Sequence, residues 1–220
     1  MSSCTSSLTS EPGARWPCES VPGAPGESKP MPSQSGIPSI ERWVRRILIG
    51  RWCRRHPPSQ SVAILREQQH ELVSLVETAG AEAITRVQIR RLPGLEHSST
   101  NYSLAMVVDH LARVNRDLAT TLESLAQNQP GTITVVIANY KPDPGAKPQQ
   151  AMADLDASIA ALEQSLADTG KLERSTQMHA HPWFGDLPAT TWACFAPFHQ
   201  TIHLKQARLI ASALKSTARS

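Results

Sequence analysis

Apolar residues recur every three or four positions along most of the chain after residue 38, which is the spacing of one face of an α-helix. The clearest stripe predicts a helix that opens near Ser103 and runs to about Gln127. Its apolar positions are Leu104, Val107, Leu111, Val114, Leu118, Leu122 and Leu125. Similar stripes predict three more helices, with approximate ranges of 60–79, 152–169 and 192–213.

The helices are joined by connections of roughly twenty residues, whereas up-and-down hairpins use shorter loops. We therefore expect residues 60–216 to form an all-α domain, a four-helix bundle with long crossover connections. Gly170 is expected to stop the third helix, and the β-branched stretch 132–138 is a candidate for a short extended crossing. Pro197 lies inside the fourth helix and is expected to kink or restart it, because proline lacks a backbone N–H.

Residues 39–56 predict an additional N-terminal amphipathic helix that is strongly basic. Ser39 is a suitable N-cap, and Pro57 and Pro58 end the segment. The apolar side comprises Ile40, Trp43, Val44, Ile47, Leu48 and Trp52, and the arginines are Arg42, Arg45, Arg46, Arg51, Arg54 and Arg55. Two interpretations stay open: the helix docks on the bundle by its Ile/Trp side, or it lies on an anionic membrane surface.

Residues 1–38 are about half Ser, Pro and Gly and contain almost no aliphatic residues. Such a segment buries too little apolar surface to offset the entropy of ordering it, so we predict a disordered tail. Whether Met1 or Met31 starts the protein is left open.

Composition narrows the class of protein. The formal net charge of +3 is too mild to indicate nucleic-acid binding. No apolar run reaches the about eighteen residues that a transmembrane helix requires, and the N-terminus lacks the basic start and apolar block of a secretory signal. The four cysteines form no CxxC pair, which disfavours a disulfide framework or zinc knuckle and indicates a cytoplasmic location.

Three histidines form the candidate functional centre. His199 and His203 stand four residues apart, so their rings lie on one helix face about 6 Å apart along the axis. His110 lies beside the apolar stripe of the 103–127 helix. Three imidazoles on buried faces need polar partners, and one shared divalent metal ion would satisfy all of them. Residues 200–202 contain no glutamate, so the metallopeptidase motif is incomplete and peptidase chemistry is disfavoured.

Most aromatic residues of the C-terminal third precede the histidine pair. Those we expect to contribute to a pocket are Trp183, Phe184, Trp192 and Phe195. They either wall an apolar pocket over a metal or fill one end of the bundle, and the sequence leaves both interpretations open.

Two stretches resemble the DinB-like family. Tyr102–Leu111 is similar to the second helix of that family, in which an aromatic-Ser opening leads to an acidic-His-Leu signature. The segment from His181-Pro-Trp-Phe-Gly to His199 and His203 resembles its closing loop and last helix, although Pro197 departs from the expected pattern. The resemblance implies a bundle that holds a divalent metal, most often zinc or nickel, on His110, His199 and His203. It also implies frequent homodimers.

Characterised members of that family include S-transferases and isomerases that use low-molecular-weight thiols. The resemblance thus implies a metal-dependent enzyme, a thiol S-transferase or hydrolase, that activates a thiol or water toward a small electrophilic substrate. The alternative is a non-catalytic metal-binding or stress-response module that associates with a membrane or partner through the basic helix.

Overall fold

The computed structural model describes the backbone of residues 39–217 and the side chains of residues 43–217. The predicted disordered tail and the choice between Met1 and Met31 fall outside the described residues. The helices are α1 (Ser39–Arg55), α2 (Ser61–Ala79), α3 (Leu104–Ala126), α4 (Pro148–Leu166), α5 (Thr169–Arg174) and α6 (Ala189–Thr217). Short 3₁₀ turns cover Pro58–Gln60, Gly80–Ile84, His97–Thr100 and Ile137–Tyr140.

Two short antiparallel hairpins lie in the connections. Strand β1 (Val87–Gln88) pairs with β2 (Asn101–Tyr102), and β3 (Met178–His181) pairs with β4 (Gly185–Pro188). Neither hairpin belongs to a larger sheet, so the expected all-α class is confirmed for the described part of the chain.

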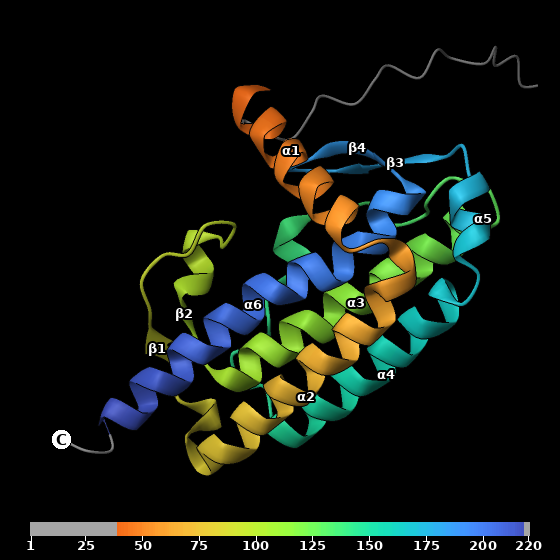
Figure 1. The fold of residues 1–220 in the computed structure, drawn as a ribbon. Helices are drawn as coiled ribbons and strands as arrows, with labels where there is room; N and C mark the ends of the chain where they lie inside the picture. The colour runs from red at the N-terminus through yellow and green to blue at the C-terminus, as the bar shows by residue number, and fades with distance from the viewer. Residues whose placement is uncertain (1–38, 218–220) are drawn as a thin grey trace, which may run out of the picture. The chain divides into compact units, whose positions relative to one another are not determined.

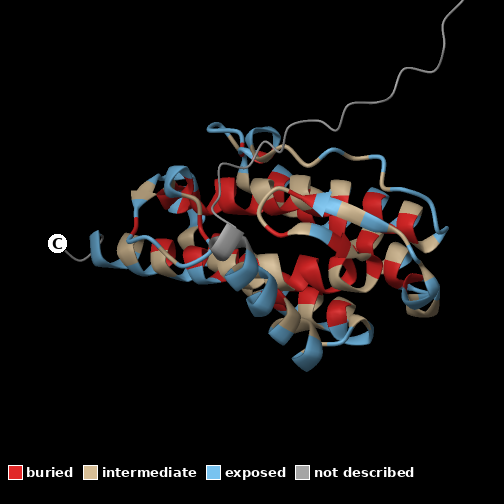
Figure 2. Cartoon of the chain, turned by 90° about the horizontal axis from the view of Figure 1, so that it is seen from above, coloured by how far each residue is buried: buried red, intermediate tan, exposed pale blue. Residues whose placement is uncertain are grey.

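Helices α2, α3, α4 and α6 form a four-helix bundle (Figure 1). Helix α2 packs mainly against α6 and α4, and α3 packs against the same two helices, so α2 and α3 are diagonal to each other. The connections 80–103 and 167–188 therefore cross the bundle between diagonal helices, as their length indicated. Figure 2 shows the buried residues concentrated between the helices.

The third long connection, residues 127–147, has a different cause. Helices α3 and α4 are neighbours that run in the same direction, so the chain must return along the length of α3 before α4 begins (Figure 1). Two hydrogen bonds mark the two ends of this pair. Asp109 Oδ2 accepts from the backbone N–H of Asp143 at 2.9 Å, and Ser165 donates to the carbonyl of Ala119 at 3.1 Å.

One local prediction is wrong. Gly170 does not stop α4, which ends at Leu166; it lies inside α5, whose first turn is capped by the Asp168 side chain accepting from the Lys171 N–H. Residues 132–136 cross along α3 without pairing with any strand, and they lead into the 3₁₀ turn Ile137–Tyr140, so the expected crossing ends at residue 136.

Pro197 does not interrupt α6, which is continuous from Ala189 to Thr217. A proline at this position leaves the carbonyl of Ala193, four residues earlier, without its helical donor. The hydroxyl of Ser61, the first residue of α2, donates to that carbonyl at 3.0 Å. The hydrogen bond lost within α6 is thus replaced by one between helices, so the expected restart of the helix does not occur.

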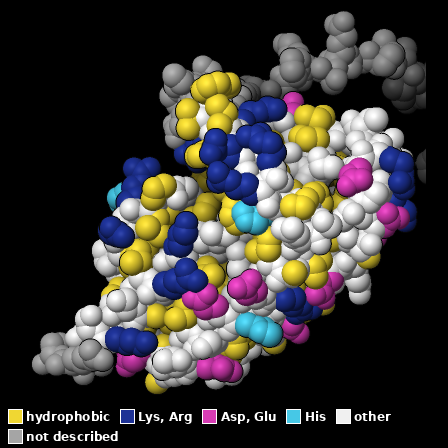
Figure 3. Space-filling model, in the orientation of Figure 1, with side chains coloured by type: hydrophobic (Ala, Val, Ile, Leu, Met, Phe, Trp, Pro, Cys, Tyr) yellow, Lys and Arg dark blue, Asp and Glu magenta, His cyan; other side chains and the backbone are white. Residues whose placement is uncertain are grey.

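Helix α1 docks on α6 through only part of its predicted apolar side. Trp52 of that side packs edge-to-face on Phe198 with ring centroids 5.7 Å apart, and Ile49, which the pattern did not place on it, is buried. The N-terminal half extends beyond the bundle, and its large apolar side chains are exposed: Trp43, Val44, Ile47 and Leu48 (Figures 1 and 3). Helix α1 thus does dock on the bundle, but most of its Ile/Trp side stays uncovered; the membrane surface stays a prediction. Among the described residues, no helix combines the length and apolar character needed to span a bilayer.

Candidate metal centre

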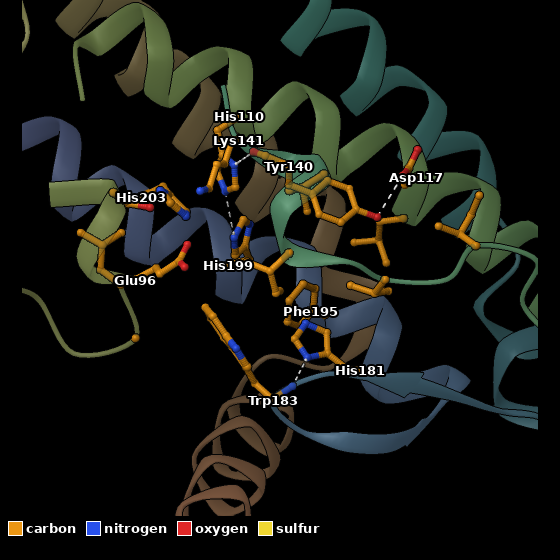
Figure 4. Close-up of a pocket in the computed structure, with 18 of the residues that line it drawn as sticks. Glu96, His110, Asp117, Tyr140, Lys141, His181, Trp183, Phe195, His199 and His203 are labelled. Atoms are coloured by element: carbon orange, nitrogen blue, oxygen red, sulfur yellow. Dashed lines mark hydrogen bonds between the residues drawn. The ribbon is translucent and has the colours of Figure 1, made fainter. Parts of the chain in front are cut away.

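The structure brings His110 of α3 together with His199 and His203 of α6 (Figure 4). One nitrogen from each ring lies within 4.8 Å of the other two, and the Nε2 atoms of His110 and His199 are 3.4 Å apart. His110 lies about two turns after the Ser103 cap of α3, whose side chain accepts from the backbone N–H of Met106 at 3.2 Å. The aromatic-Ser motif thus sets where α3 begins, and with it the position of His110.

His110 is oriented by the α3–α4 connection. Its Nδ1 lies 2.5 Å from the carbonyl oxygen of Tyr140. A carbonyl only accepts hydrogen bonds, so Nδ1 bears the proton and Nε2 keeps its lone pair. The Tyr140 side chain fixes the same turn, because its hydroxyl donates to Asp117 Oδ2 at 2.9 Å. Burial, and then the adjacent carboxylate, raise the pKa of Tyr140, so the hydroxyl remains a donor.

His203 is oriented by Gln206. The amide nitrogen of Gln206 donates to the carbonyl of Ser99 at 2.7 Å, which leaves its oxygen to face His203 Nδ1 at 2.7 Å. His203 therefore donates from Nδ1 and keeps the Nε2 lone pair, as His110 does. Gln206 is fully buried, so this chain of hydrogen bonds is shielded from water.

His199 is the least satisfied of the three rings. Phe195 stacks on the His199 ring with ring planes 14° apart. The buried Nδ1 of His199 has no hydrogen-bond partner. The Nε2 atom of His199 lies 3.4 Å from the lone pair of His110 Nε2. In the absence of a cation, His199 would donate to that lone pair from Nε2. Its Nδ1 would then be a buried acceptor without a donor.

The surroundings favour neutral rings. Withdrawal from water lowers the pKa of His110, and the Tyr140 carbonyl only partly opposes this. Burial also holds the pKa values of His199 and His203 well below their usual range, and each ring's histidine neighbours lower them further. Metal ions bind neutral imidazole, so these rings are available as ligands at neutral pH.

Three convergent neutral nitrogens, two of them oriented through their Nδ1–H groups, fit a divalent metal ion. A cation shared by the three Nε2 atoms would hold the His199 proton on Nδ1, and it would occupy the Nε2 lone pairs of His110 and His199 that then converge. No carboxylate among the described residues completes the cluster, so positions on such an ion would stay open to water or substrate.

A cavity adjoins the three histidines, between α3 and α6, and the connections cover it. Trp183, Trp192 and Phe195 line this cavity, as the sequence suggested for a pocket, whereas Phe184 lines a neighbouring groove with Phe195 and His199. The wall farther along α3 is apolar and consists of Val114, Leu118, Ile133, Val135 and Ile137. The aromatic residues are therefore part of a hollow next to the histidines.

Two groups of this cavity were not among the expected ligand and pocket residues. Glu96 lines it, and Figure 4 shows its carboxylate among the histidine side chains. His181 is buried at 6% exposure, and its Nδ1 accepts from the Trp183 backbone N–H at 3.1 Å. Both residues lie in connections, where no helical period predicts the position of a side chain. The resemblance of the His181-Pro-Trp-Phe-Gly segment drew attention to His181, whereas no pattern in the sequence indicated Glu96.

Comparison with known proteins agrees with the geometry. A family model described as the DinB superfamily matches residues 64–207, which include all three histidines. No curated protein and no solved structure matches the chain.

Proposed function

This chain belongs to the DinB superfamily, and we propose that it is an enzyme whose divalent metal ion is held by His110, His199 and His203. The observation that supports this best is the convergence of three neutral imidazoles beside a walled cavity. A metal bound there supplies Lewis acidity that lowers the pKa of a coordinated thiol or water toward neutrality.

Glu96 is the residue we propose as proton acceptor. It lines the cavity beside the histidines, and its negative charge acts to raise the pKa of His110, although less than the Tyr140 carbonyl and Asp109 do. The only other acidic residue in the lining, Asp117, is engaged by the Tyr140 hydroxyl. Glu96 is therefore better placed to take a proton from a thiol or water nucleophile.

The cavity walls favour a small electrophile with an apolar body. The aliphatic residues of α3 and of the 133–137 stretch exclude water from one side, and Trp183, Trp192 and Phe195 form the other. We propose a low-molecular-weight thiol or water as nucleophile, and zinc or nickel as the metal. The homodimer and the cytoplasmic location stay predictions.

Metal analysis of the purified protein tests the centre. We expect about one equivalent of divalent metal per chain, lost in His199→Ala/His203→Ala. The matched control is His70→Ala/His97→Ala, which removes two exposed histidines outside the cavity and should keep the metal. Equal metal content in all three proteins would show that the cluster is not the binding site.

A turnover assay tests the chemistry. Protein loaded with zinc or nickel is offered low-molecular-weight thiols and small electrophiles, and Glu96→Gln should slow turnover by roughly 10²–10⁴-fold at unchanged metal content. If the metal stabilises the fold but no pair of thiol and electrophile reacts, the result would favour the alternative function, a non-catalytic metal-binding module.

A further inference from the structure

The free half of α1 exposes an unusual concentration of large apolar side chains. Trp43 is 63% exposed and Leu48 is 55% exposed, with Val44 and Ile47 between them. Within the part of the chain that the structure describes, the other exposed large hydrophobic residues are Ile84 and Met178, which belong to separate segments. Four of these six side chains thus lie within two turns of one short helix, which indicates a contact surface.

The same helix is basic. Arg46, Arg51, Arg54 and Arg55 are all exposed, and no acidic residue occurs between Glu41 and Glu67. Arg51, Arg54 and Arg55 follow the exposed apolar residues along α1 by one to three turns. The apolar N-terminal end of the helix is therefore followed by a positively charged segment. Figure 3 shows the dark-blue side chains directly beside the yellow end of α1.

We propose that α1 docks this protein on an anionic lipid bilayer. The apolar group of Trp43, Val44, Ile47 and Leu48 would enter the acyl boundary, and the arginines that follow would contact lipid phosphates. Trp and Leu beside Arg is the composition of helices that lie at a membrane interface. This proposal does not depend on the enzymatic activity proposed above.

Charge argues against a second copy of the chain as the occupant. A two-fold contact through α1 would place the exposed arginines of both copies close together, and like charges oppose such an interface. The N-terminal tail is also a poor occupant, because its branched aliphatic residues are only Leu8, Val21 and Ile37. An anionic bilayer complements both features, because its phosphates match the arginines and its acyl region matches the apolar end.

An apolar groove continues from α1 toward the candidate metal centre. Val44 and Leu48 line it on one side, Phe184 and Phe198 on the other, and His199 lies along it. Trp183 and Gly94 line both this groove and the cavity that holds the histidines. If α1 docks on a bilayer, this groove, which leads to the candidate metal centre, would therefore lie next to the lipid surface.

Vesicle flotation of the full chain tests the proposal. We expect binding to vesicles of phosphatidylcholine with about one third phosphatidylglycerol, weak binding to phosphatidylcholine alone, and loss of binding as salt increases. Trp43→Ser/Leu48→Ser and, separately, Arg46→Gln/Arg51→Gln should each weaken binding roughly tenfold or more. Because all four side chains are exposed, we expect the helical circular dichroism to be unchanged.

Two matched controls make the test specific. Ile84→Ser/Met178→Ser removes two exposed apolar side chains elsewhere, and Arg116→Gln/Lys205→Gln removes two exposed charges elsewhere; both should bind like the unaltered protein. Equal losses in variants and controls, or no flotation with the anionic vesicles, would overturn the proposal. So would a dimer in solution that Trp43→Ser/Leu48→Ser converts to monomer while vesicle binding is unaffected.

Discussion

His203 donates from Nδ1 to the side-chain oxygen of Gln206 across 2.7 Å, from one turn of α6 to the next. The amide group of Gln206 in turn donates to the Ser99 carbonyl, also at 2.7 Å. The loop before α3 and the last helix thereby set together which nitrogen of His203 faces the cavity. A hydrogen bond of this kind orients a metal-ligating histidine and raises its basicity.

Gln206→Leu should weaken metal binding by roughly 10–100-fold, because His203 loses the acceptor that holds its ring. A competition titration with a chromophoric chelator measures the affinity. Gln206→Glu is the matched variant: it keeps an acceptor for His203 but removes the donor to Ser99. We expect it to retain the affinity while the free energy of unfolding falls, and an equally large affinity loss in both variants would contradict the role assigned to Gln206.

Ser61→Ala should lower the free energy of unfolding by about 1–3 kcal/mol, because the Ala193 carbonyl loses the hydroxyl that donates to it in place of residue 197. The cost should be much smaller in a Pro197→Ala background, where residue 197 regains a backbone N–H that reaches Ala193 within α6. Urea unfolding of the unaltered protein, the two single variants and the double variant measures the coupling free energy between residues 61 and 197. Equal costs in both backgrounds would show that Ser61 does not compensate for Pro197.

Removal of the metal should destabilise the protein. A ligand that binds only the folded state stabilises it by about 2.7 kcal/mol at a hundredfold excess over its dissociation constant, so a chelator should lower the Tm. Differential scanning calorimetry with and without chelator measures the shift. His199→Ala/His203→Ala should show no chelator response, and a chelator-sensitive Tm in that variant would indicate a different metal site.

Acidification should destabilise the chelated protein, partly through His181. Burial lowers the pKa of His181 to about 3, and the nearby His179 and Arg45 contribute. An unfolded histidine titrates near 6.5, so between about pH 6.5 and 3 the unfolded chain binds a proton that the folded one does not. Stability is therefore complete above about pH 6.5 and decreases as the pH falls toward 3.

His181→Phe removes this titration while keeping an aromatic ring against Phe184 and Phe195. Urea unfolding across the same pH range should give a shallower decrease than in the unaltered chelated protein. His70→Phe, at an exposed position, is the control and should leave the slope unchanged. The same slope in His181→Phe would contradict the assignment of the acid sensitivity to His181.

The sequence by itself determined the helices of the bundle. The three-four stripe of α3 and the Ser103 cap placed that helix almost at its observed bounds. The spacing of His199 and His203 needed only the helical period to put both rings on one face. These predictions succeed because helical periodicity and capping are local properties of the chain.

Only the tertiary structure decided which residues surround the histidines. The Tyr140 carbonyl and Glu96 reach the centre from connections, where no periodic pattern predicts position. The parallel course of α3 and α4, which lays the 127–147 connection along α3, is likewise a property of packing. Packing likewise decided how much of the apolar side of α1 is covered, a question that the sequence left open. An amphipathic pattern shows which side of a helix is apolar, but the neighbouring helices determine how much of that side they cover.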